Sequence, residues 1–161
     1  MLNHKRIVIV GASASGKNVL RSKFEDRGFT FGVSYTTREI RPGETQDKHY
    51  HFISRETFEE FISMNKFYES TEYNGNYYGS GIYEWHNSNC FIMETSGIKN
   101  IKSMDRKNCF IIYLNPSQIV RETRMLMRGW DVKKIKERID IDKEKFVNFT
   151  DYDLVISNSN F

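Results

Sequence analysis

Seven residues near the start of the 161-residue chain could bind phosphate. They read Gly11, Ala12, Ser13, Ala14, Ser15, Gly16 and Lys17, and fit the pattern G-x-x-x-x-G-K. The glycines let the backbone wrap closely, so that its N–H groups point at phosphate oxygens, and Lys17 would reach the β- and γ-phosphates. A buried strand is expected before the motif and a helix after it, whose N-terminal end favours an anion. We therefore expect a nucleoside triphosphate site, with a plain glycine-rich turn as the alternative.

The residue after this loop bears on metal binding. Asn18 stands where Ser or Thr normally supplies a hydroxyl to Mg²⁺. An amide oxygen can also ligate a hard cation, with a different reach and geometry. Asn18 is therefore the metal-ligand candidate of the motif.

A second group of side chains could hold another phosphate. Arg38 and Arg41 lie three residues apart in an expected loop, and Tyr50 and Tyr78 follow. Arginine forks and tyrosine hydroxyls are natural partners for a phosphomonoester. For any one of these residues alone, a surface arginine or a core tyrosine would be the simpler interpretation.

A row of arginines marks the C-terminal third of the chain. Arg121, Arg124 and Arg128 share one face of an expected helix, and Arg138 follows beyond a break at Gly129. On the pattern alone, this row is typical of a solvated basic face.

These residues need a scaffold to position them. Strands are expected at 6–10, 29–35, 49–53, 67–73, 76–79, 90–93, 109–114 and 154–156. Helices are expected at 18–27, 58–62, near 98–104, 117–127 and 132–149. Alternation of strands and helices predicts an α/β fold with a parallel sheet covered on both faces. The section at 33–80 is rich in strands and loops, which predicts an insertion into this frame.

Composition restricts the class of protein. Apolar residues make up 39% and charged residues 28%, which is typical of a soluble globular domain. The net charge of +3 is too small to indicate nucleic-acid binding by itself. The apolar run at 7–10 is too short for a signal peptide or a membrane span, so a cytoplasmic protein is expected. Cys90 and Cys109 are expected to be buried thiols.

Taken in order, the motifs resemble the guanylate kinase family from Ile7 to about Asn160. They read GASASGK, VSYTTREIRPGE, HYHF, FYES, GNYYGS, RMLMRG and YDLVISN. The resemblance implies a single domain over 1–161: a P-loop core at 1–32 and 81–161, a lid near 124–138, and a monophosphate-binding insertion at 33–80. It implies transfer of a phosphoryl group from ATP, with Mg²⁺, directly in line to a nucleoside monophosphate, with GMP or dGMP as the expected acceptor.

The resemblance also implies roles for individual residues. Those expected at the monophosphate are Ser34, Arg38, Arg41, Tyr50, Glu69, Tyr78, Ser80 and Glu94. Among them Glu69 would accept from N1–H and the N2 amino group of guanine, a pair of donors that adenine lacks. The residues expected at ATP are those of the loop, Asn18, and Asn158 near the adenine. Those expected to assist catalysis are Lys17, Arg38, Arg124, Arg128 and Arg138. Arg121 has no counterpart and is expected at the surface.

Two departures from the family pattern lie around the metal. Ile92 replaces the first carboxylate of a pair that ends with Glu94, and Asn18 replaces a hydroxyl. These changes leave a non-catalytic nucleotide-binding module as one alternative. A kinase of the same fold for another deoxynucleotide or a phosphorylated sugar is the other. Ribose or deoxyribose preference and oligomeric state are not predicted.

Overall fold

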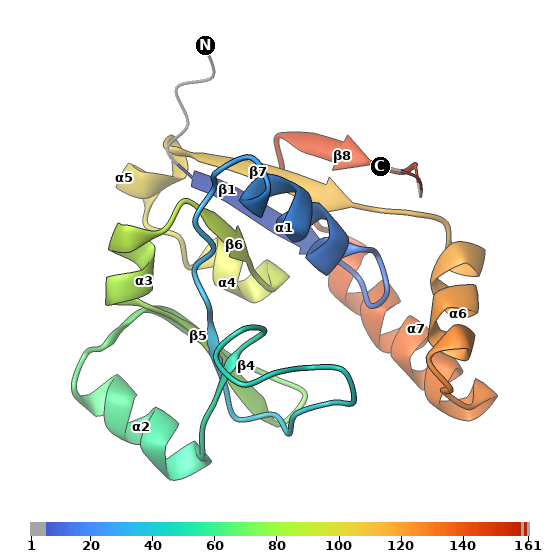
Figure 1. Ribbon diagram of the computed structural model, residues 1–161, viewed down its shortest axis with the longest axis horizontal. Coiled ribbons are helices and arrows are strands. Elements are labelled where there is room, and N and C mark those ends of the chain that lie inside the picture. Colours follow the sequence, from blue (N-terminus) through green and yellow to red (C-terminus); the bar gives the residue numbers. More distant parts are fainter. Residues whose placement is uncertain (1–5, 159, 161) are drawn as a thin grey trace.

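A parallel sheet flanked by helices forms the centre of the molecule (Figure 1). The computed structural model describes residues 6–158 and 160. The sheet has the order β6-β1-β7-β8, and every pairing in it is parallel. Its strands are β1 (Arg6–Gly11), β6 (Cys90–Ile92), β7 (Cys109–Leu114) and β8 (Leu154–Ile156). The predicted α/β class is therefore confirmed.

The central strand β1 is buried on both faces, which explains its uninterrupted β-branched sequence. Val8 and Val10 face a core cluster that includes Trp85 and Ile98, whereas Ile9 faces another that includes Leu20. Helix α1 thus covers one face, while α3, α4 and the end of α7 cover the other. The helices around this sheet are α1 (Lys17–Glu25), α3 (Ile82–Asn87), α4 (Thr95–Lys99), α5 (Ser103–Arg106), α6 (Gln118–Met127) and α7 (Val132–Phe146).

A second, smaller sheet has the order β3-β2-β5-β4. Its elements are β2 (Tyr35–Thr36), β3 (His51–Phe52), α2 (Arg55–Ser63), β4 (Phe67–Tyr73) and β5 (Asn76–Gly81). Asn74 and Gly75 join β4 to β5 with φ angles of 50° and 74°, and two left-handed residues are what a type I′ hairpin turn requires. The hairpin predicted here is confirmed. Phe58 of α2 is fully buried and stacks on Phe67 with ring centroids 4.3 Å apart.

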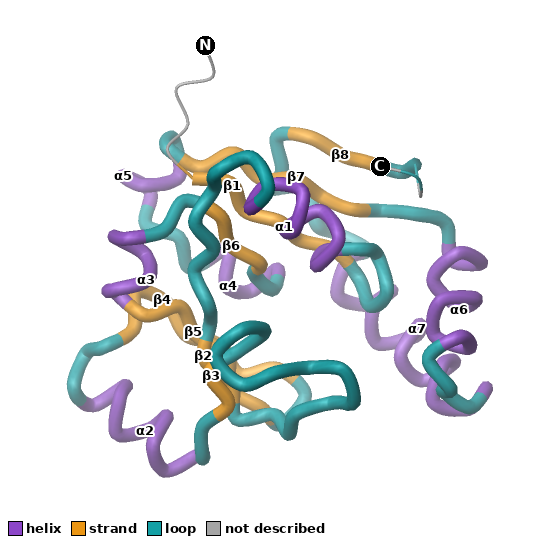
Figure 2. Tube along the Cα trace, in the orientation of Figure 1, coloured by secondary structure: helices purple, strands orange, loops and turns teal. Residues whose placement is uncertain are grey.

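Helices α6 and α7 form a hairpin beside the loop that follows β1 (Figure 1). Met125, Ile135 and Ile139 cluster with Ala14 of that loop. The long loop between β2 and β3 extends from the smaller sheet toward the side where α7 lies (Figure 2). The three parts therefore converge on the phosphate-loop motif.

Three details of the expected secondary structure are wrong. The strand expected at 29–35 is an extended segment in which Phe31 alone bridges to Cys90, and β2 begins only at Tyr35. This segment runs parallel to β6, where Gly32 N donates to Cys90 O at 2.8 Å and a Cβ on Gly32 would lie 2.2 Å from the ring of Phe91. Helix α3 was not expected, and the helix expected near 98–104 is divided into α4 and α5.

Both cysteines are fully buried free thiols, as expected. Among the described residues, none of the helices has the length and apolar character needed to cross a membrane.

Candidate functional site

The phosphate loop connects the end of β1 to the start of α1. Gly16 caps α1 with a φ of 102°, and a Cβ on Gly11 would lie 2.6 Å from Ser15 Oγ and 2.7 Å from Leu114 O. Both positions therefore require glycine, one for its backbone angle and the other for space. The result is a tight loop that leads directly into a helix N-terminus.

Lys17 lies folded over this loop. Its Nζ donates to Gly11 O at 2.6 Å and to Ala12 O at 3.0 Å. Burial lowers the pKa of Lys17 to about 8; Asp142 opposes this shift, while Arg138 and other arginines add to it. A crowded set of cations of this kind favours a polyanionic ligand.

One cavity extends from the loop to the smaller sheet. The predicted site residues that line it are Ser13, Ala14, Ser15, Gly16, Lys17, Asn18, Ser34, Arg38, Arg41, Tyr50, Tyr78, Glu94, Arg128 and Arg138. Trp130 and Glu44 also line it, and neither was expected there. Asn158 lies beyond the end of β8 and is not among the described residues that line this cavity.

Glu44 organises the arginines at the far end of the cavity. Its carboxylate accepts from both terminal nitrogens of Arg38, each at 2.9 Å, and from Arg41 N at 2.8 Å. Burial and the charges of Arg38 and Arg138 lower the pKa of Arg41, so this guanidinium would gain from an added anion. Burial raises the pKa of Tyr50 to about 12, which keeps its hydroxyl a donor. The feature of the sequence that could have pointed to Glu44 is its position three residues after Arg41 in the same loop.

Glu69 lies in an adjoining recess that shares Ser34, Tyr50 and Tyr78 with the main cavity. Ser80 donates to Glu69 Oε1 from its backbone N at 3.1 Å and from its hydroxyl at 2.8 Å. Oε2 is buried and has no hydrogen-bond partner among the described residues. Burial raises the pKa of Glu69 to about 7, although the hydrogen bonds from Ser80 oppose the shift. One oxygen is therefore fixed and the other is available to a ligand.

Glu94 lies between this recess and the phosphate loop, and it forms an ion pair with Lys145 of α7. Burial and the nearby charge of Lys17 lower the pKa of Lys145 to about 7. Lys145 was not expected at the site, because nothing in the sequence links it to a residue so distant in the chain.

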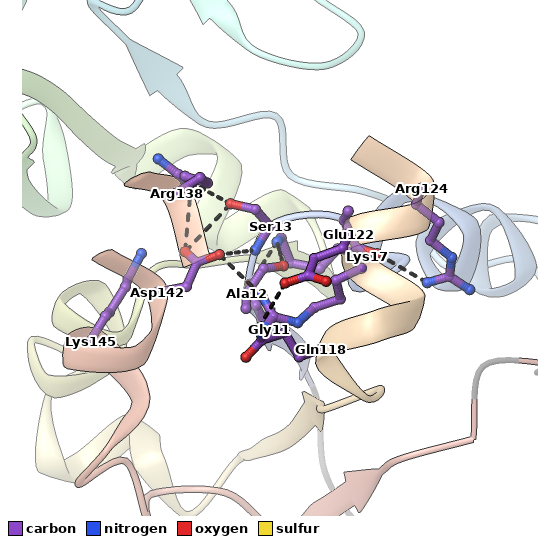
Figure 3. A network of polar contacts seen from close by, with 12 residues as sticks. Gly11, Ala12, Ser13, Lys17, Gln118, Glu122, Arg124, Arg138, Asp142 and Lys145 are labelled. Carbon is purple, nitrogen blue, oxygen red and sulfur yellow. Dashed lines mark hydrogen bonds and ion pairs between the residues drawn. The ribbon is translucent and has the colours of Figure 1, made fainter. Parts of the chain in front are cut away.

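The arginines of the α6–α7 hairpin differ in their placement (Figure 3). Arg124 donates to Ala14 O at 3.0 Å, and Arg138 Nε donates to Ser13 Oγ. Arg128 lines the cavity from an exposed position at the end of α6. Arg121 was expected at the surface, and this expectation is wrong. The residue is buried and pairs with Asp142 at 3.3 Å. The spacing that placed it on one face with Arg124 could not show that a buried carboxylate faces it.

The residues around Asn18 make a poor metal cage. Within the described part of the chain, His, Cys, Asp and Glu do not form a group of three or more that could hold a metal ion. Asn18 is exposed at the cavity, Ile92 adds an apolar wall, and Glu94 is engaged by Lys145. A divalent ion here would depend on oxygen ligands from a phosphorylated substrate.

Comparison with known proteins agrees with this geometry. The family model described as guanylate kinase matches residues 3–161. The guanylate kinase of Vibrio parahaemolyticus is 33% identical in an alignment that covers 96% of this chain and 80% of that protein. The guanylate kinase of Syntrophus aciditrophicus is 32% identical, over 94% of this chain and 77% of the relative.

The fold is also that of a solved structure. The guanylate kinase of Anaplasma phagocytophilum superimposes with a TM-score of 0.67 at 23% identity, covering 97% of this chain and 78% of that one. The chain therefore belongs to the guanylate kinase family, and it is a nucleoside monophosphate kinase.

Proposed function

We propose that this protein transfers the γ-phosphoryl group of ATP to GMP or dGMP. The observation that carries the proposal is the free Oε2 of Glu69 in a recess that adjoins the cavity of the phosphate loop. A triphosphate on the loop and a purine at Glu69 would place two phosphate groups between Lys17 and Arg38.

Recognition of guanine follows from the donors that Glu69 can accept. Guanine presents N1–H and an N2 amino group on one edge, and one ionised carboxylate can accept from both. Adenine would instead direct its N1 lone pair at the carboxylate and leave a buried charge unpaired, which costs affinity strongly. Because Ser80 fixes Oε1, the carboxylate is already oriented when the base enters.

The phosphate of the monophosphate would be held by Arg38, Arg41, Tyr50 and Tyr78. Its oxygen is already a nucleophile, so the reaction needs no strong general base. It can attack the γ-phosphorus in line as the bond to ADP breaks, with no covalent enzyme intermediate. Cations around the transferred group would stabilise its spread of negative charge; they are Lys17, Arg38, Arg124, Arg128 and Arg138.

Mg²⁺ would enter with ATP and lower the charge of the phosphates. Asn18 is the side chain that could contact it, through its amide oxygen, and Glu94 would be available only without Lys145. We therefore propose that the substrate phosphates, rather than the protein, hold most of the metal's coordination shell.

We also propose a division of labour along the chain. Residues 33–80 would bind the monophosphate and 124–138 would act as the lid, both attached to a core of 1–32 and 81–161. Residues 1–5 of that core lie outside the described part of the structure. Support comes from the smaller sheet, which carries Glu69 and Tyr78, and from the α6–α7 hairpin, which carries the arginines. Asn158, in the loop after β8, would lie near the adenine of ATP.

An acceptor panel tests the substrate. The protein is incubated with ATP, Mg²⁺ and one acceptor at a time, and ADP is measured by a coupled assay. GMP and dGMP should be turned over, and AMP, CMP, dTMP and a sugar phosphate should not. Turnover of a different acceptor alone would contradict the guanine assignment, and no turnover of any acceptor would favour the non-catalytic module.

A further inference from the structure

A fully buried carboxylate lies where helix α7 meets the phosphate loop (Figure 3). Asp142 has 2% of its surface exposed. A buried carboxylate is costly unless hydrogen bonds and opposite charges compensate it. The contacts of Asp142 therefore indicate which role the buried carboxylate has in this protein.

The contacts of Asp142 connect three parts of the site. Ser13 of the phosphate loop donates to it from the backbone N at 2.9 Å and from Oγ at 3.4 Å. Arg138, one turn earlier on α7, approaches Oδ1 with Nε at 3.6 Å. Arg121 of α6 pairs with Oδ2 at 3.3 Å. Ser13, Asp142 and Arg138 thus form a closed triangle, because Arg138 Nε also donates to Ser13 Oγ.

The atom of Arg138 that is used matters for chemistry. The polar contacts of its guanidinium with Ser13 and Asp142 both employ Nε, on the inner edge of the group. Its two terminal nitrogens form no hydrogen bond with another described residue, and the side chain lines the cavity. A guanidinium held by one edge can present the other to a phosphate in a fixed direction.

The charge balance also fits an orienting role. Arg121 is buried and supplies the first positive charge that Asp142 needs. Arg138 is therefore not required to neutralise Asp142, and its charge remains for the substrate. Asp142 itself does not line the cavity.

We propose that Asp142 is a positioning residue for phosphoryl transfer, which fixes the direction of Arg138 and holds Ser13 of the phosphate loop against α7. This inference rests on the proposed kinase reaction. Small errors in the placement of a catalytic group cost much of the rate. Loss of Asp142 should therefore affect turnover more than it affects binding of GMP.

The test is a double-mutant cycle with Arg138. Asp142→Asn keeps the size and an acceptor for Ser13 N but removes the charge, and kcat should fall about tenfold or more, while KM for GMP changes less than about twofold. In an Arg138→Ala background the same change should lower kcat by less than about twofold, because the group it positions is gone. Asp140→Asn, an exposed change on the same helix, is the matched control.

Thermal unfolding checks that each variant is folded, and a second variant serves as a further control. Arg121→Met with Asp142→Asn removes both members of the buried pair, which avoids an unpaired buried charge; it should lose kcat to the same extent. The proposal would be overturned if the losses of kcat from Asp142→Asn and Arg138→Ala were additive. It would also be overturned if kcat stayed within twofold of the wild type in folded Asp142→Asn or in the folded Arg121→Met, Asp142→Asn double variant. If the wild type phosphorylates no acceptor, both the proposed function and the role of Asp142 are refuted. If the wild type is active and the variants are unaffected, only the role of Asp142 is refuted.

Discussion

Glu69 shows at the scale of one residue how a binding site opposes stability. The residue is 8% exposed, and one oxygen of its carboxylate is satisfied by Ser80 while the other has no partner among the described residues. Burial raises its pKa from 4.5 to about 7. Folding therefore favours the protonated form more than water does, whereas recognition of two guanine donors requires the ionised form. The bound base would supply the hydrogen-bond donors that Glu69 Oε2 lacks in the folded protein.

Replacement of Glu69 should separate these two effects. Because its folded pKa lies above the unfolded value, the stability contributed by Glu69 is present at low pH and is lost as the pH rises through about 7. Glu69→Gln cannot ionise, so its free energy of unfolding at pH 8 should exceed that of the wild type by about 3 kcal/mol, with little difference at pH 4.5. Urea unfolding at both pH values measures this.

The same variant should bind GMP poorly, with KM raised about a hundredfold or more, because an amide N–H would face the N1–H of guanine. Glu72→Gln, an exposed position on the same strand, should change neither property. An unchanged KM for GMP in Glu69→Gln would remove Glu69 from the base site.

The elements that position these residues were predictable where the pattern is local. The β-branched run of β1, the glycines of the phosphate loop and the turn at Asn74 and Gly75 each specify their own backbone, and the structure confirms all three. The segment at 29–35 has the composition of a strand but makes a single bridge to β6, and its Gly32 packs against the ring of Phe91, a contact that no local pattern reveals. Helix α3 is only six residues long and depends on the packing of Trp85.

Helix α4 approaches Glu69 through Gly97. A Cβ at Gly97 would lie 3.0 Å from Glu69 Oε2, tighter than ordinary contact. Gly97→Ala should therefore displace the free oxygen and raise KM for GMP about tenfold, while KM for ATP stays within twofold. Steady-state kinetics with each substrate varied in turn measure the two constants. Ser96→Ala on the same helix is the control, and equal effects on both KM values would contradict the assigned geometry.

The α6–α7 hairpin depends on its buried ion pair. Arg121 is 8% exposed and Asp142 is 2% exposed. Removing one partner of such a pair leaves an uncompensated charge and typically costs roughly 3–5 kcal/mol. Arg121→Met should lower the free energy of unfolding by about 3 kcal/mol, measured by urea unfolding at pH 7. Lys136→Met, an exposed change on α7, should lower it by less than about 0.5 kcal/mol, and similar losses in both would refute the pairing.

At the scale of the whole molecule, the sequence predicts which residues form the site but not how they hold one another. Most of the phosphate loop, four of the predicted arginines, both tyrosines and Glu69 line two adjoining recesses, whereas Arg124 contacts the loop at Ala14 without lining either of them. Two of the supports come from distant segments, with Asp142 beneath Ser13 and Lys145 beside Glu94, whereas Glu44 supports Arg38 from within the same loop. Asp142 and Lys145 look like ordinary charged helix positions in the sequence, because only the packing of α7 on the loop buries them.

The convergence of cations has a consequence for ATP binding. Burial lowers the pKa of Lys17 to about 8, with further lowering from arginines of α6, α7 and the loop after β2. A triphosphate would favour the protonated ammonium, so binding at pH 8 should take up roughly half a proton. Titration calorimetry in buffers of different ionisation enthalpy measures that number. Lys17→Met should reduce the uptake, and an unchanged uptake would assign it to other groups.

The central claim is that one enzyme site joins the phosphate loop to the recess of Glu69. Phosphorus NMR of the protein with ATP, GMP and Mg²⁺ tests it most directly, because it resolves each product. We expect ADP and GDP to appear together in equal amounts, with inorganic phosphate released no faster than in the absence of the protein. Loss of ATP to inorganic phosphate without GDP, or no change in the spectrum, would contradict it.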